Sequence, residues 1–174
     1  MAGTRIVLTG PECTGKTTLA SALAEHFGAP WVPEAARRFA ETATEPLSAA
    51  TVEPIARLWI TAADAALAQS PPLCFFDTDL VSTVVYARHY YGQCPAWIEA
   101  AARTRRADLY LLGTPDLPWT PDGIRDRPLH RETLFADFGS VLRGLGARTV
   151  LLSGKGPART AAAVRAIETL LRRD

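Results

Sequence analysis

The sequence predicts an α/β fold with three layers, in which a five-stranded parallel sheet lies between helices on both faces. Five short apolar runs alternate with longer stretches whose apolar residues recur at helical spacing. Because a helix between two strands carries the chain back to the starting end of the sheet, this alternation makes the strands parallel. A length of 174 residues suits one domain, and we find no repeat or linker, so we expect a single domain over residues 1–174.

The amino-terminal part begins with a strand and a helix. Residues 4–9 (TRIVLT) form an apolar run that predicts a buried strand, and a glycine-rich turn follows. Residues 16–27 carry leucine, alanine and phenylalanine on one stripe, which predicts an amphipathic helix. We expect a short second strand at residues 31–32 and a helix over residues 34–41.

The middle of the chain continues the alternation. Apolar residues recur at helical spacing over residues 55–66, and two prolines at 71 and 72 end this stretch. Residues 73–76 (LCFF) predict a third strand. Two helices are expected next, the second beginning at Pro95, because proline is favoured in a first helical turn.

The carboxyl-terminal part completes the sheet. We expect a fourth strand over residues 107–112, a helix over 130–142 and a fifth strand over 149–152. Val164, Ile167 and Leu171 then predict the apolar stripe of a last helix.

The composition excludes several classes of function. With 19 basic and 18 acidic residues the net charge is +1, which does not favour bulk neutralisation of phosphates, so we expect no nucleic-acid partner. No apolar run approaches the roughly 18 residues of a spanning helix and the first residues do not form a signal peptide, so we expect no membrane partner. The cysteines (Cys13, Cys74 and Cys94) are odd in number and widely spaced, which indicates reduced thiols in a cytoplasmic protein.

Residues 10–17 (GPECTGKT) fit the phosphate-loop pattern G-x-x-x-x-G-K-[ST], between a strand and a helix. The glycines let the backbone wrap a phosphate, and the helix directs the positive end of its dipole at the same place. Lys16 supplies a charge to the β- and γ-phosphates, and the Thr17 hydroxyl is a ligand for Mg²⁺. The motif predicts a P-loop NTPase fold that uses ATP with Mg²⁺ as cofactor. The residues expected to bind ATP are Gly10, Glu12, Cys13, Thr14, Gly15, Lys16, Thr17 and Thr18.

Carboxylates follow the second and third strands, at the edge where open parallel sheets bind their ligands. Asp77 is the better candidate to hold Mg²⁺, whereas Asp79 either contacts substrate or caps the next helix. Glu34 is placed to accept a proton from a substrate hydroxyl, or it is a helix-terminal glutamate favoured by the dipole. Arg37 lies on the same helical face and can hold Glu34 or a phosphate.

A segment rich in proline and glycine, about residues 114–131, predicts a mobile lid. Arginines that close with a lid stabilise the charge of a transferring phosphoryl group, and a closed lid excludes water. Plain solvated arginines are the alternative for this loop. The residues concerned are Asp116, Trp119, Asp122, Arg125, Arg127 and Arg131.

A last candidate lies after the fifth strand. The turn there is expected beside the base of the nucleotide, so Arg159 can stack on adenine. A surface arginine at the start of a helix is the alternative interpretation.

Four motifs in their order and spacing resemble the bacterial nicotinamide riboside kinases, the kinase half of the NadR-type proteins of NAD salvage. These are GPECTGKT, then PEAAR, then FFDTDLVST, then LYLLGTPDLPWTPDGIR. The resemblance runs from about Arg5 to the final helix. It implies a fold like those of the nucleoside and thymidylate kinases, with a lid. It also implies transfer of the γ-phosphate of ATP to the 5′-hydroxyl of nicotinamide riboside, giving the mononucleotide.

The resemblance also implies roles for the candidate site residues that occupy matching positions in the motifs. Lys16 and Thr17 hold phosphate and Mg²⁺, and Asp77 and Asp79 lie between metal and substrate. Glu34 and Arg37 line the riboside side, and Arg125 and Arg127 belong to the lid. Asp116, Trp119 and Asp122 of the lid segment are also expected to contact the substrate.

The sequence departs from the family at three positions. Ala35 stands where the family often has an aromatic residue, Arg38 lies near a position that is often acidic, and Pro121 replaces an acid of the lid. An aromatic ring can stack on a pyridinium, so Trp31 is expected to compensate for Ala35. Two alternatives stay open: a kinase of another nucleoside or nucleotide, and a regulatory P-loop ATPase without a small acceptor.

Overall fold

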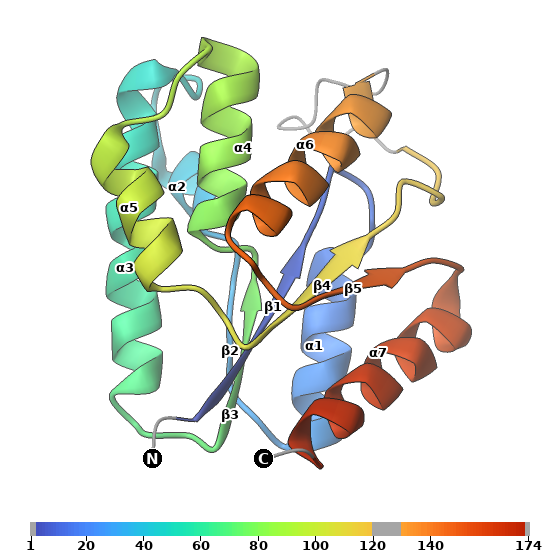
Figure 1. Cartoon of the computed structure of the whole chain (residues 1–174). Coiled ribbons are helices and arrows are strands. Elements are labelled where there is room, and N and C mark those ends of the chain that lie inside the picture. Colours follow the sequence, from blue (N-terminus) through green and yellow to red (C-terminus); the bar gives the residue numbers. More distant parts are fainter. Residues whose placement is uncertain (1–2, 120–129, 173–174) are drawn as a thin grey trace.

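The computed structural model describes residues 3–119 and 130–172, and it confirms the predicted fold class (Figure 1). Five parallel strands form one sheet in the order β2-β3-β1-β4-β5. The strands are β1 (Thr4–Thr9), β2 (Trp31–Val32), β3 (Leu73–Asp77), β4 (Leu109–Gly113) and β5 (Thr149–Leu152). Because β1 pairs with β3 and with β4, the phosphate loop that follows β1 leaves the middle of the sheet.

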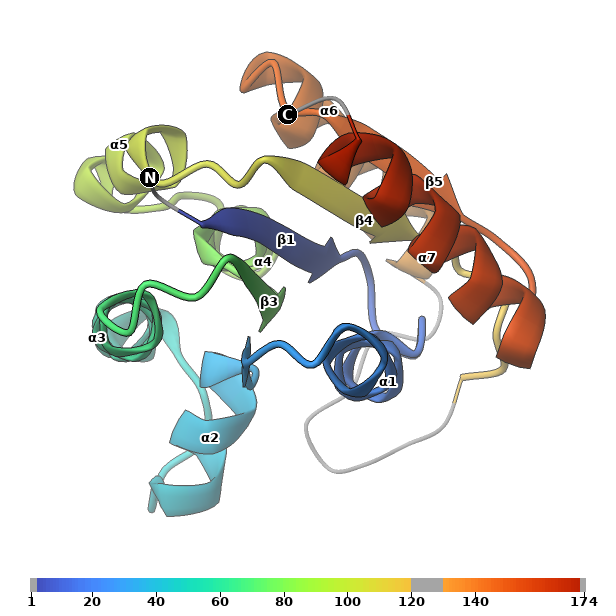
Figure 2. The same ribbon diagram turned by 90° about the horizontal axis from the view of Figure 1, so that it is seen from below.

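Alternate residues of the strands build two separate cores. Ile6 and Leu8 are buried in the core against α1 and α7, whereas Val7, between them, is buried in the other core. Figure 2 shows α1 and α7 on one side of the sheet and α3, α4, α5 and α6 on the other. The helices are α1 (Lys16–Phe27), α2 (Ala35–Thr42), α3 (Val52–Leu67), α4 (Leu80–Tyr91), α5 (Ala96–Thr104), α6 (Arg131–Gly144) and α7 (Gly156–Leu171).

Four predicted elements have the expected bounds: β1, α1, β2 and β5. The helix expected from residue 55 begins at Val52, because Pro54 fits its first turn, where no backbone N–H is needed. A short 3₁₀ helix, η1 (Ala49–Thr51), precedes it and was not predicted. The last helix buries Ala163, Ile167 and Leu170, whereas Leu171 is 37% exposed, so the predicted stripe was wrong at its end.

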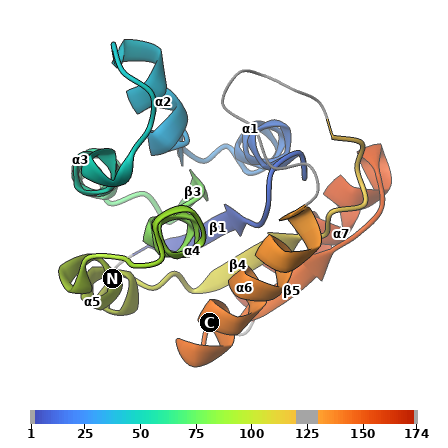
Figure 3. The ribbon, with the colours of Figure 1, turned by 90° about the horizontal axis from the view of Figure 1, so that it is seen from above.

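The carboxyl ends of the strands meet at one edge of the sheet, which Figure 3 views from above. The connections that begin there include the phosphate loop over residues 10–15, the turn after β3 and the segment after β4. The parallel topology therefore gathers segments that lie far apart in the sequence. Within the described residues, no helix combines the length and apolar character needed to cross a membrane.

Candidate active site

The phosphate loop passes very close to the end of β4. Gly10 has φ 126° and Gly15, the residue before α1, has φ 74°, both in the region that favours glycine. A Cβ atom on Gly10 would lie 2.8 Å from the carbonyl oxygen of Gly113. A larger residue would therefore both strain the loop and push it away from β4.

Lys16 and Thr17 form the first turn of α1, and no side chain caps this helix end within the described residues. Lys16 Nζ donates a 2.8 Å hydrogen bond to the carbonyl oxygen of Pro11. The hydroxyl of Thr14 donates to the same oxygen at 3.0 Å, which ties the loop to itself. Backbone N–H groups and a lysine ammonium at a helix amino end are a setting that attracts phosphate.

Asp77 is fully buried at the end of β3 and faces the phosphate loop. Thr17 Oγ1 donates a 2.5 Å hydrogen bond to Asp77 Oδ2. Burial raises the pKa of Asp77, and this hydrogen bond and the charges of Lys16 and Arg37 oppose that rise. Asp77 Oδ1 is buried with no hydrogen-bond partner among the described residues.

This pair of oxygen groups fits Mg²⁺. A hydroxyl beside a carboxylate with an unsatisfied buried oxygen offers the hard ligands that this ion prefers. The described residues contain no group of three or more acidic, histidine or cysteine side chains that could hold a metal. An ion bound by Thr17 and Asp77 would therefore take its other ligands from water and from phosphate, as Mg²⁺ commonly does.

Asp79 caps α4, which was one of its two predicted roles. Its Oδ1 accepts a 2.9 Å hydrogen bond from the N–H of Val81, and its Oδ2 accepts one of 2.7 Å from the Tyr110 hydroxyl. Burial raises the pKa of Asp79 to about 6, although these hydrogen bonds act against the rise. Asp79 also lines the pocket described next, so contact with a substrate stays a prediction.

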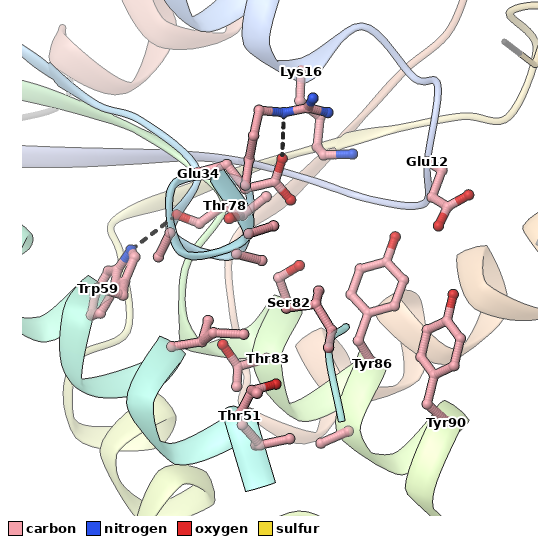
Figure 4. Close-up of a pocket in the computed structure, with 18 of the residues that line it drawn as sticks. Glu12, Lys16, Glu34, Thr51, Trp59, Thr78, Ser82, Thr83, Tyr86 and Tyr90 are labelled. Atoms are coloured by element: carbon pink, nitrogen blue, oxygen red, sulfur yellow. Dashed lines mark hydrogen bonds and ion pairs between the residues drawn. The ribbon is translucent and has the colours of Figure 1, made fainter. Parts of the chain in front are cut away.

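A pocket of about 780 Å³ joins the phosphate loop to the space between α2, α3 and α4 (Figure 4). Near the loop its wall contains Glu34, which lies 3.8 Å from Arg37 Nε, so Arg37 does hold Glu34. The predicted ATP-binding residues from Glu12 to Thr18 also line this pocket. Candidate phosphate and acceptor residues thus face one continuous cavity.

The far wall of the pocket is aromatic, and the sequence analysis missed it. Tyr86 and Tyr90 lie one turn apart on α4, with ring centroids 6.1 Å apart and ring planes at 27°. Figure 4 shows their hydroxyls directed toward the side where Glu12 lies. Trp59 of α3 donates a 3.1 Å hydrogen bond to the carbonyl oxygen of Thr78. The i, i+4 spacing of two tyrosines in the helix after Asp79 was a signal that could have revealed this wall.

Trp31 was expected in the acceptor site, and the structure places it elsewhere. Trp31 packs with Phe27 against the core on the α1 and α7 side, whereas Val32 is buried on the pocket side. Neighbouring strand residues point to opposite faces, so the residue next to Trp31 faces the pocket helices instead. The expectation that Trp31 replaces an aromatic residue at Ala35 was therefore wrong.

Asp116 and Arg159 bind each other and do not line the pocket. Arg159 Nη1 lies 3.2 Å from Asp116 Oδ1, and Arg159 Nη2 donates to the carbonyl oxygens of Thr114 and Leu152. The Arg159 side chain is only 5% exposed. Its guanidinium thus joins the ends of β4 and β5 to α7, which argues against the expected stacking on adenine and against substrate contact by Asp116.

The lid segment is described only in part. Trp119 Nε1 lies 3.5 Å from Glu12 Oε2, so its indole approaches the phosphate loop, although it does not line the pocket. Asp122, Arg125 and Arg127 lie outside the described residues, and their roles stay predictions.

A phosphate loop between the first strand and first helix of a parallel sheet, with Thr17 hydrogen-bonded to Asp77, defines the class of P-loop NTPase folds. A family model described as an AAA domain matches residues 5–159, and the chain belongs to this family.

Curated relatives include the trifunctional NAD biosynthesis/regulator proteins NadR of Escherichia coli (strain K12) and Salmonella typhimurium (strain LT2). Each is 28% identical over 127 residues, which cover 69% of this chain. The chain spans about 30% of the length of these relatives.

Solved structures with a similar fold include the NadR protein in complex with NR, with a TM-score of 0.83 and 23% identity. That match covers 97% of this chain and 51% of the other. The NadR protein in complex with NAD and AMP-PNP has a TM-score of 0.81 and 22% identity, over 97% and 49%. Thymidylate kinase from Ehrlichia chaffeensis has a TM-score of 0.68 and 13% identity, over 96% and 100%. These structures share the P-loop kinase fold with this chain.

Proposed function

We propose that this chain is a small-molecule kinase that transfers the γ-phosphate of ATP to the 5′-hydroxyl of nicotinamide riboside. The observation that carries the proposal is the single cavity of about 780 Å³. Lys16 and Thr17 lie at one end of it, Glu34 lies beside them, and tyrosines form the far wall. A donor site and an acceptor site in one cavity suit direct transfer between two bound molecules.

The lining of the far wall suits a flat, positively charged ring. Tyr86 and Tyr90 offer aromatic faces and Trp59 adds apolar surface, and aromatic rings attract cations over their faces. The nicotinamide ring of the riboside carries a positive charge. Tyr86 and Tyr90 thus replace Trp31 as the proposed aromatic partners of the acceptor. The NadR protein whose structure contains NR supports the same acceptor, since its fold covers 97% of this chain.

The proposed chemistry is an in-line displacement at the γ-phosphorus. Glu34, held by Arg37, accepts the proton of the 5′-hydroxyl as that oxygen bonds to the γ-phosphorus. The bond from the γ-phosphorus to the β,γ-bridging oxygen breaks, and ADP leaves. Lys16 binds the β- and γ-phosphates. Thr17 and Asp77 would hold Mg²⁺, which would neutralise phosphate charge when bound. Arg125 and Arg127 are proposed to close over the transferring group within a single kinase domain.

A nucleoside panel tests the proposal. Release of ADP is measured with ATP, Mg²⁺ and either nicotinamide riboside, thymidine, adenosine or no acceptor. We expect the riboside to be consumed fastest and to give its mononucleotide. If thymidine or adenosine is turned over faster than the riboside, that nucleoside is the acceptor. A rate of ADP release that no acceptor changes would instead indicate a regulatory ATPase.

The two lysines of the chain provide matched variants for this assay. Lys16→Met should reduce turnover by about 100-fold or more, because it removes a charge that stabilises the transferring phosphate. Lys155→Met changes an exposed lysine before α7 and should keep the activity of the unmodified chain. Equal rates for the unmodified chain and Lys16→Met would attribute the ADP to a contaminating enzyme.

A further inference from the structure

Arg131 joins the phosphate loop to the segment after β4. Its Nε donates a 3.2 Å hydrogen bond to the carbonyl oxygen of Glu12, and its Nη2 donates one of 3.2 Å to that of Cys13. Its Nη1 donates a 2.8 Å hydrogen bond to the carbonyl oxygen of Leu117. One half-buried guanidinium at the start of α6 thus connects two segments that lie more than 100 residues apart.

The segment that Arg131 holds also packs directly on the loop. The Cδ1 atom of Leu117 lies 3.2 Å from the position that a Cβ atom of Gly15 would take. The indole of Trp119 lies close to the side chain of Glu12, as described above. Leu117 therefore contacts the end of the loop at Gly15, whereas Trp119 and Arg131 both contact its middle at Glu12.

The bonded carbonyls decide where the loop N–H groups point. In a trans peptide the carbonyl of one residue and the N–H of the next point in opposite directions. Holding the carbonyls of Glu12 and Cys13 toward Arg131 therefore directs the N–H groups of Cys13 and Thr14 away from it. Glu12, Cys13 and Thr14 all line the pocket, whereas Arg131 does not.

Cys13 is the residue of the loop that most needs this support. Its φ of 54° lies in the left-handed region, which is unfavourable for a residue with a side chain. The hydrogen bond from Arg131 to the Cys13 carbonyl stabilises that conformation. Hydrogen bonds from a charged donor are stronger than those from a neutral one, which suits an arginine for this task.

We propose that Arg131 is a positioning residue for the nucleotide: it holds the phosphate loop in its phosphate-binding shape without touching the phosphates itself. This role rests on the nucleotide-binding half of the proposed function and does not depend on the acceptor. Arg131 therefore differs from Arg125 and Arg127, for which direct contact with the transferring group is proposed.

Calorimetry with two probes tests the role of Arg131. MgATP and inorganic tripolyphosphate with Mg²⁺ are each titrated into the unmodified chain and into Arg131→Ala and Arg131→Lys. We expect both variants to bind both probes about 10- to 100-fold more weakly, since the loop contacts only the phosphates. Lysine does not restore affinity, because one ammonium cannot bond three separated carbonyls in the plane of a guanidinium. Added guanidinium ion should partly restore the affinity of Arg131→Ala.

Two controls separate positioning from a general loss of structure. Arg143→Ala removes an exposed arginine from the same helix and should leave both affinities unchanged. The thermal unfolding midpoint of Arg131→Lys without nucleotide should stay within a few degrees of that of the unmodified chain.

Three results would overturn the role of Arg131. They are unchanged MgATP affinity in Arg131→Ala, full affinity in Arg131→Lys, and a loss confined to ATP that spares tripolyphosphate. A failure of the unmodified chain to bind MgATP would be a different result, because it would reject the proposed function and this role with it.

Discussion

The hydroxyl of Tyr110 donates a 2.7 Å hydrogen bond to Asp79 Oδ2 and thereby links the first half of β4 to the start of α4. Both side chains are buried, at 0% and 4% exposure, and the other Asp79 oxygen caps the helix. Since Ser82, Thr83 and Tyr86 of α4 line the pocket, this buried pair sets the position of the acceptor wall.

The pair predicts a pH dependence of stability. The pKa of Asp79 is about 6 in the folded chain against an ordinary value of 3.8, so the folded state binds the proton more tightly. The free energy of unfolding should therefore fall as pH rises from about 4 to about 6, by up to about 3 kcal/mol. Asp79→Asn lacks the titrating carboxyl. The free energy of unfolding of this variant, relative to that of the unmodified chain, should therefore rise between about pH 4 and about pH 6. Urea unfolding at pH 4.5, 5.5 and 7 measures this, and parallel profiles for the two proteins would contradict it.

Asp77→Asn should separate activity from stability. The variant keeps the shape of the side chain and an acceptor for Thr17 but removes a buried charge, whose burial raises the Asp77 pKa. We expect a higher thermal unfolding midpoint, a turnover about 100-fold lower and a higher Mg²⁺ requirement. Mg²⁺ titration of the activity and differential scanning calorimetry test the two halves. A lower midpoint with an unchanged Mg²⁺ requirement would assign Asp77 a purely structural role.

Arg159→Met should destabilise the fold and spare nucleotide binding. The change leaves Asp116, the buried carbonyl oxygen of Leu152 and the partly buried one of Thr114 without their charged donor, which costs roughly 2–4 kcal/mol. Urea unfolding measures the loss, and MgATP titration below the unfolding transition measures affinity. If stability is unchanged and ATP affinity falls tenfold, Arg159 stacks on adenine after all.

Arg125→Ala should lower kcat by roughly 100-fold while the affinity for MgATP changes by less than about threefold. Its predicted contact strengthens only as charge develops on the transferring group. Steady-state kinetics together with equilibrium binding separates the two quantities. Arg165→Ala, an exposed arginine of α7, is the matched control. A kcat equal to that of the control would reject the assignment of Arg125 to the lid.

Sequence patterns of short range predicted much of the fold. The run TRIVLT, the motif GPECTGKT and the amphipathic stretch over residues 16–27 place β1, the loop and α1 with their observed bounds. Each signal depends on residues a few positions apart, so the local chain carries it whatever the rest of the molecule does. The pairing of Thr17 with Asp77 was within reach as well, because both follow strands of one parallel sheet.

The tertiary structure decided which side chains meet. Trp31 and Val32 are neighbours in β2 whose side chains lie on opposite faces of the sheet. The packing of the helices against the sheet placed Val32, and not Trp31, on the pocket side. The ion pair of Arg159 with Asp116 and the bonds of Arg131 to the loop join residues 43 to 119 positions apart. Such contacts depend on the order of strands in the sheet and on which face each helix covers. No local pattern of residues encodes that order, because it is fixed when distant apolar surfaces are buried together.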